Sequence, residues 1–161
     1  MTKIWKRIFN SFMALILITI VLTACTKGGS TGKNPSIVEI NNKLSEAIDL
    51  SKMDNGDGEV LEKFYDIDSN KLEEFVLYMP KTNIEVNEIA ILKVKNTSDL
   101  EDIKEKIENR IEEQGNAFRD YIPEEYYLIE NHVLKTKDNY ILFAIYEDVD
   151  KIEKVFDESF K

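Results

Sequence analysis

Residues 87–94, Asn87-Glu88-Ile89-Ala90-Ile91-Leu92-Lys93-Val94, decide the fold, because they have the pattern of a core strand. An apolar run of this length between polar residues is typical of a strand in a protein core. The preceding segment, Glu74–Met79, is rich in aromatic and aliphatic residues and is ended by Pro80. Together they predict two strands, over 74–79 and 88–95, joined by a turn over 81–87.

The segment that follows has the pattern of a long amphipathic helix. Ser98 and Glu101 have the spacing of a capping box, which marks a helix N-terminus. Gly115-Asn116 indicates a kink or an end of the helix before residue 118. Apolar residues recur at helical spacing along one face: Leu100, Ile103, Ile107, Ile111 and Phe118.

A second unit of two strands and a helix comes next. Tyr126–Lys135 and Tyr140–Tyr146 predict a hairpin that turns near Lys137-Asp138-Asn139. Asp148 is then the expected cap of a last helix. The apolar side of that helix carries Val149, Ile152, Val155, Phe156 and Phe160.

The order of these elements predicts an α+β fold. We expect a four-stranded antiparallel sheet built from two ββα units, with the two long helices on one face. A helix over residues 36–49 precedes them, and it either packs beside the long helices or closes the other face. Met53–Gly58 has the composition of a turn, and a short helix with Val60, Leu61 and Phe64 follows it.

The N-terminus has the pattern of a bacterial lipoprotein signal. Residues 1–10 carry Lys3, Lys6 and Arg7 and no acid, and residues 12–22 are apolar except for Thr19. This run has the length of a signal-peptide core and is too short to cross a bilayer core of roughly 30 Å. Leu22-Thr23-Ala24-Cys25 resembles the lipobox, in which the leader is removed and the cysteine is diacylated. The alternative is an ordinary secreted protein with a chance cysteine.

These patterns divide the chain into three parts: a lipoprotein signal peptide at 1–24, a lipidated flexible tether at 25–34 and a single α+β domain at 35–161. The tether has three glycines and no large apolar residue, as flexible coils do. Because two acyl chains give stable anchoring, we expect a diacylglyceryl group on Cys25 to hold the domain at the outer face of the cytoplasmic membrane.

The charge of the chain restricts its partners. The net charge is −10, and removal of residues 1–24 takes away three basic and no acidic residues, which leaves −13. Such a domain repels phosphate backbones and anionic headgroups and accommodates neutral or cationic partners. We therefore expect no nucleic-acid binding, and an envelope protein or peptide is the expected kind of partner.

Several motifs occur in an order that is similar to one bacterial family. They are the lipobox leader, the strand and turn at 75–80, the strand at 87–94, the Glu/Lys/Ile-rich helix after it and the strand at 139–143. Together they resemble the domain of unknown function 4358 of Gram-positive lipoproteins, from about residue 57 to the C-terminus. The resemblance implies a membrane-anchored extracytoplasmic protein and supplies no catalytic residue or ligand.

Motifs for metal binding and catalysis are weak. The chain has one histidine, His132, and its one cysteine is assigned to acylation, which argues against a zinc site and a thiol nucleophile. The Asp54–Asp57 and Asp66–Asn70 segments invite a calcium interpretation, but neither register places a glutamate at the twelfth position. Turn and cap chemistry explains both segments. We predict no catalytic residue, no metal and no cofactor.

The candidate binding surface consists of Tyr78, Glu88, Tyr140 and Tyr146. Along their strands the three tyrosines alternate with residues such as Phe143. If residues such as Phe143 pack under the long helices, the tyrosines share the opposite face of the sheet. Amphipathic tyrosine side chains suit interfaces. The alternative is that the first helix covers this face and the tyrosines lie at the rim of the core. Glu88 is included as an acid that begins a core strand, for which a structural role is the alternative.

Two functions follow from these features. The first is a non-catalytic extracytoplasmic module that binds a protein, peptide or envelope component through the tyrosine-bearing face, and it requires an open apolar face of several hundred Å². The second is a lipid-tethered cell-envelope hydrolase that uses a carboxylate pair. It requires two buried acids in a pocket, with pKa values that their surroundings separate.

Overall fold

The computed structural model describes residues 33–161, so the predictions for the signal peptide, for Cys25 and for most of the tether lie outside the described residues. The helices are Ile37–Ala47 (α2), Gly58–Tyr65 (α3), Leu100–Phe118 (α4), Pro123–Glu130 (α5) and Val149–Ser159 (α6). The strands are Met53–Gly56 (β1), Leu72–Pro80 (β2), Glu88–Val94 (β3), Val133–Lys137 (β4) and Tyr140–Ile145 (β5). Within this range, no helix has the length and apolar character needed to cross a membrane.

The strands form one antiparallel sheet with the order β1-β2-β3-β5-β4. The prediction of an α+β fold with an antiparallel sheet is confirmed, but the prediction of four strands is wrong, because β1 is a fifth. It pairs with the C-terminal half of β2, from Met53 opposite Pro80 to Gly56 opposite Leu77. Its Asp-Asn-Gly composition is typical of a turn. Pairing with β2 and burial of Met53 override that local preference.

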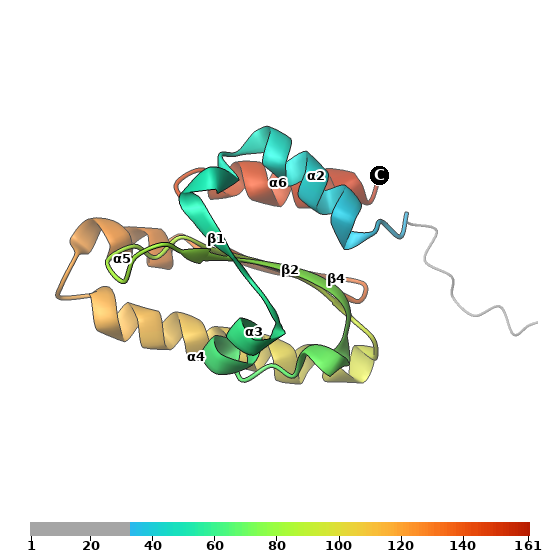
Figure 1. Cartoon of the computed structure of the whole chain (residues 1–161), viewed down its shortest axis with the longest axis horizontal. Coiled ribbons are helices and arrows are strands. Elements are labelled where there is room, and N and C mark those ends of the chain that lie inside the picture. The colour runs from blue at the N-terminus through green and yellow to red at the C-terminus, as the bar shows by residue number, and fades with distance from the viewer. Residues whose placement is uncertain (1–32) are drawn as a thin grey trace, which may run out of the picture. The chain divides into compact units, whose positions relative to one another are not determined.

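Helices cover both faces of the sheet, whereas the sequence predicted both long helices on one face (Figure 1). α2 and α6 pack together over one face, and α3 and α4 pack over the other. The N-terminal helix therefore closes the face opposite α4. The cause lies in β3 and β5, where every residue is buried. Strands that are buried on both sides need a layer of structure on each side.

The segment predicted as the strand 126–135 begins instead as a helix. Pro123 occupies the first turn of α5, where its missing N–H costs nothing. The strand is confined to β4, which starts at Val133 and pairs with β5 through a turn at Asp138-Asn139. Asp138 has a φ of 52°, a left-handed conformation that aspartate tolerates in turns. The predicted position of the hairpin turn is therefore confirmed, and the start of its first strand is wrong.

Two predicted helix caps are not formed by side chains. α4 follows a short 3-10 turn over Thr97–Asp99, and no side chain caps its N-terminus. Asp148 is the N-cap residue of α6, as predicted, but its side chain makes no cap hydrogen bond and accepts instead from Lys151 Nζ at 2.6 Å. α4 also continues through Gly115 to residue 118. Packing against the sheet therefore sets these helix boundaries more strongly than local cap chemistry does.

Gly56 lies where β1 meets the core beneath it. A Cβ atom at this position would lie 2.6 Å from Leu77 Cδ2 and 3.1 Å from Val60 Cγ1, and Leu77 is buried. We expect Gly56→Ala to lower the free energy of unfolding by about 1–3 kcal/mol, because the buried leucine must shift. Urea denaturation measures the effect. Gly58→Ala is the matched control, since the nearest atom there is the rotatable Ser69 hydroxyl, and equal losses in the two variants would contradict this packing.

Candidate functional site

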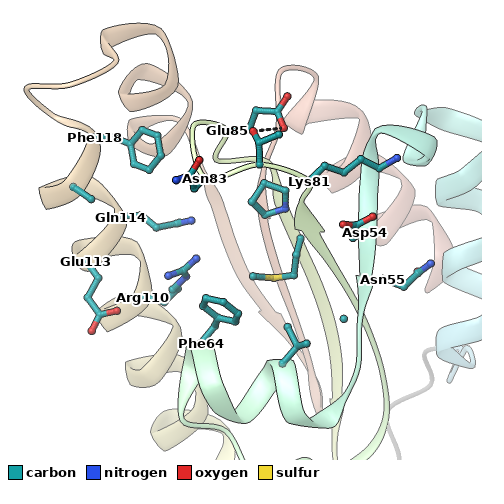
Figure 2. A pocket seen from close by; sticks show the side chains of 16 residues that line it. Asp54, Asn55, Phe64, Lys81, Asn83, Glu85, Arg110, Glu113, Gln114 and Phe118 are labelled. Atoms are coloured by element: carbon teal, nitrogen blue, oxygen red, sulfur yellow. Dashed lines mark hydrogen bonds between the residues drawn. The ribbon is translucent and has the colours of Figure 1, made fainter.

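A pocket of about 550 Å³ opens between α3, α4, β1 and the loop that joins β2 to β3; we call it the α3–α4 pocket (Figure 2). Its apolar wall is formed by Val60, Phe64, Met79, Pro80, Ala117 and Phe118. Arg110 and Gln114 from α4, Asn83 from the loop and Asp54 from β1 extend toward the same space (Figure 2). An apolar wall with a few convergent polar groups is typical of a site for a small ligand or a side chain of a partner.

The register of α4 explains why two polar side chains reach this pocket. Ile103 and Ile107 lie on the buried stripe of the helix. Arg110 and Gln114 continue that stripe at spacings of three and four residues, which keeps them on the same helical face. Two polar residues therefore join the core-facing side of α4 where the helix passes the pocket, between Ile107 and Phe118.

Glu88, the first residue of β3, is fully buried next to Arg110. Its Oε1 accepts hydrogen bonds from Arg110 Nε at 3.3 Å and from Nη2 at 3.0 Å. Three buried atoms beside this pair make no hydrogen bond of ordinary geometry among the described residues: Glu88 Oε2, the Tyr65 hydroxyl and Gln114 Oε1. The Tyr65 and Gln114 side chains nevertheless lie close enough to Glu88 to stabilise its negative charge. Buried polar atoms without partners cost folding free energy, so this cluster departs from ordinary core packing.

Burial also changes the acidity of this cluster. It raises the pKa of Glu88, because the desolvated carboxylate is disfavoured relative to the neutral acid, and the Arg110 guanidinium only partly opposes the shift. Burial raises the pKa of the Tyr65 hydroxyl well above its ordinary value, and the negative charge of Glu88 adds to that rise. Because a buried ion pair is costly to break, the pair holds the guanidinium in the pocket wall.

Acidic groups outnumber basic ones around the pocket. Among the described residues that line it, Asp54, Glu85 and Glu113 are acidic, and Lys81 and Arg110 are basic. Lys81 Nζ donates to a backbone carbonyl, that of residue 51, at 2.8 Å. Arg110 is already paired with a carboxylate. The pocket therefore has little positive charge left to bind an anion.

The structure buries the three tyrosines of the predicted binding surface. Tyr78, Tyr140 and Tyr146 do share one face of the sheet, as their alternation predicted, but α2 and α6 cover that face. Two of their hydroxyls form hydrogen bonds to residues in α2 or just before it. Tyr78 donates to Asn41 Oδ1 at 2.9 Å, and Tyr140 donates to the Pro35 carbonyl at 2.6 Å. The tyrosines therefore belong to the core beneath α2 and α6, as the alternative interpretation holds.

Glu88 is separated from those tyrosines by the sheet. Along β3 it alternates with Ile89, so its side chain faces α4 while the tyrosines face α2 and α6. The sequence pointed to Glu88 as an acid in a core strand, but it did not indicate Arg110 or Gln114. The signal for these two was present, since both are polar residues at positions where the apolar stripe of α4 would continue.

The other motifs have structural roles in the described domain. The Asp57 side chain caps α3 by accepting from the backbone of Glu59 and Val60, and Asp68 caps a short turn in the same way. A ring nitrogen of His132 lies 2.7 Å from a backbone carbonyl oxygen, that of Ile129. No group of three or more His, Cys, Asp or Glu side chains within residues 33–161 is placed to hold a metal ion.

The fold and the pocket define an α+β domain with a five-stranded antiparallel sheet between two helical layers and a ligand-sized cavity at one of them. The chain belongs to the family described as domain of unknown function (DUF4358), whose sequence profile matches residues 46–146. The matched range includes all five strands and every residue named above for the pocket. No curated protein and no solved structure matches the chain.

The raised pKa of Glu88 predicts a pH-dependent effect of Glu88→Gln. The folded protein binds this proton more tightly than the unfolded chain, so Glu88 favours folding at low pH, and this contribution is lost as pH rises from about 4.5 through the raised pKa. Glu88→Gln has no ionisable group at this position, so it does not lose this contribution as pH rises. We therefore expect its free energy of unfolding, relative to wild type, to increase between about pH 4 and pH 8.

Urea denaturation across this pH range measures that difference. Glu112→Gln, which removes an exposed acid from α4, the helix that carries Arg110, is the control and should show a smaller dependence. A Glu88→Gln difference that stays constant with pH, or that falls as pH rises, would contradict the raised pKa.

Proposed function

We propose that this protein is a lipid-anchored extracytoplasmic binding protein whose domain takes up a ligand in the α3–α4 pocket without covalent chemistry. The observation that carries the proposal is the Gln114 amide. Its side chain is almost fully buried, it points into the pocket, and its Oε1 has no hydrogen-bond partner among the described residues (Figure 2). A ligand that hydrogen-bonds to this amide would supply the partner that the described residues do not supply.

The pocket replaces the tyrosine-bearing face as the proposed binding site. That face is covered by α2 and α6, so it offers no open apolar surface within the described domain. The hydrolase alternative needs two buried acids. Among residues 33–161 the structure buries one carboxylate, Glu88, and binds it to Arg110, which favours a binding role over general acid–base chemistry.

The proposed location, outside the membrane and held by a lipid anchor, is based on the N-terminal sequence. The basic start, the short apolar run and Leu22-Thr23-Ala24-Cys25 support export and acylation, and a tether with three glycines before residue 35 supports a domain displayed outside the membrane. The acidic domain supports the same arrangement, because it is repelled by anionic headgroups and stays in solution above them.

Filling the pocket should abolish ligand uptake. Ala117 lies on α4 at the pocket wall, and Trp at this position would occupy the space beside Phe118. We expect the full-length wild-type chain, incubated with an extract of Gram-positive cell envelopes, to retain compounds that Ala117→Trp does not retain, as read by mass spectrometry. Asn116→Trp, on an exposed position that does not line the pocket, is the matched control. Equal retention by all three proteins, or by none, would refute the binding role.

Acylation should depend on Cys25 alone, since the chain has no other cysteine. We expect metabolic labelling with a palmitate analogue to mark the wild-type protein in a Gram-positive host and to leave Cys25→Ala unmarked. The variant should also leave the membrane fraction, because its anchor is missing. Equal labelling of the two proteins would rule out a lipid on this residue.

A further inference from the structure

We infer that the α3–α4 pocket recognises an uncharged amide, such as a peptide bond or a primary carboxamide, carried on an apolar body. The inference rests on the proposed binding function and adds the chemical class of the ligand. It depends on three features of the pocket: the hydrogen-bonding groups on α4, the charges around the mouth and the apolar wall.

The hydrogen-bonding groups of Arg110 and Gln114 are complementary to an amide. The two residues are four apart on α4, so they lie on adjacent turns of one face. Glu88 engages Nε and Nη2 of Arg110, so its two bonds leave Nη1 as a donor. The Gln114 side chain lies against Glu88, and its Oε1 is buried. Rotation about its terminal torsion turns Oε1 toward the pocket as an acceptor. A neighbouring donor and acceptor match the carbonyl and N–H of an amide.

The charges around the pocket disfavour an anion. The guanidinium that would attract a carboxylate is already neutralised by Glu88 at 3.0 Å. A carboxylate would also meet Asp54, Glu85 and Glu113, which line the pocket. Like charges at such range raise the free energy of the bound state. An uncharged carbonyl oxygen accepts from Arg110 Nη1 without this repulsion.

A cation is disfavoured by the groups on α4. An ammonium group brings donors only, so it cannot accept a hydrogen bond from Arg110 Nη1 and would leave that donor without a partner. Asp54, Glu85 and Glu113 would attract an ammonium group to the pocket, but Phe64, Met79 and Phe118 offer it no hydrogen-bond acceptor. The ligand that satisfies both Arg110 and Gln114 is therefore polar but uncharged where it meets α4.

The apolar wall requires an apolar body next to that amide. Val60, Phe64, Met79, Pro80 and Phe118 surround the polar groups, and the volume of about 550 Å³ is that of a small-ligand site. A capped amino acid with an aromatic side chain combines both features in one molecule. The same unit occurs wherever an aromatic residue stands within an extended peptide, which makes a peptide segment the natural source of such a ligand.

Three matched probes test the inference: N-acetylphenylalanine N-methylamide, N-acetylphenylalanine and phenylalanine N-methylamide. They share the aromatic ring and differ in being uncharged, anionic and cationic. Each is titrated into the ¹⁵N-labelled full-length chain in mild detergent, with the Arg110 Nε–H and Gln114 side-chain amide signals as readout. We expect the uncharged probe to bind at least about tenfold more tightly than either charged one.

Gln114→Leu separates recognition from folding. We expect this variant to lose the preference for the uncharged probe, while its urea midpoint stays equal to wild type or rises, because a buried unpartnered amide is removed. A merely structural role for Gln114 would lower the midpoint instead. Asn116→Leu removes an exposed amide from the same helix and should change neither property.

The outcomes distinguish this inference from the proposed function. Tightest binding of the anionic or the cationic probe would overturn the amide class and leave a binding pocket in place. No signal change with any probe would also overturn the amide class. In that case, retention of envelope compounds by wild type and not by Ala117→Trp still supports a binding role. Failure of both experiments overturns the amide class and the binding role together.

Discussion

Burial of β3 and β5 on both of their faces is the constraint on which the rest of this structure depends. Side chains of successive residues point to opposite faces of a strand, so Ile89 and Ile91 build one core while Ala90 and Leu92 build the other. Each core needs its own helical cover. α2 and α6 provide one and α3 and α4 the other, and this arrangement places α4 on the side of the sheet where Glu88 lies.

The pocket forms where that second core ends. Along α4 the polar residues Arg110 and Gln114 follow Ile103 and Ile107 on the core-facing side, so polar contacts join the apolar ones there. The Glu88–Arg110 pair closes the inner side of this region at the cost of desolvating both groups. Buried polar groups without ordinary partners call for an explanation other than stability, and the role proposed for the pocket provides one.

Local pattern was sufficient to find most elements of the domain. The apolar runs at 88–94 and 140–145 and the helical spacing after residue 100 lie close to the observed bounds of β3, β5 and α4. Local pattern failed for β1, where pairing with β2 holds turn-forming residues in a strand. It also failed at the start of α5. Both failures have one cause, because short segments have weak intrinsic preferences that long-range contacts can reverse.

By itself the sequence determined the secondary structure of the long periodic segments, the sharing of one sheet face by Tyr78, Tyr140 and Tyr146, and the acidic character of the chain, since these follow from residue order and composition. Only the tertiary structure decided which helices cover which face. That choice turned the three tyrosines into core residues and brought Glu88 to Arg110, 22 positions along the chain. Periodicity specifies which residues of an element face the same way, but contacts between distant segments specify what they face.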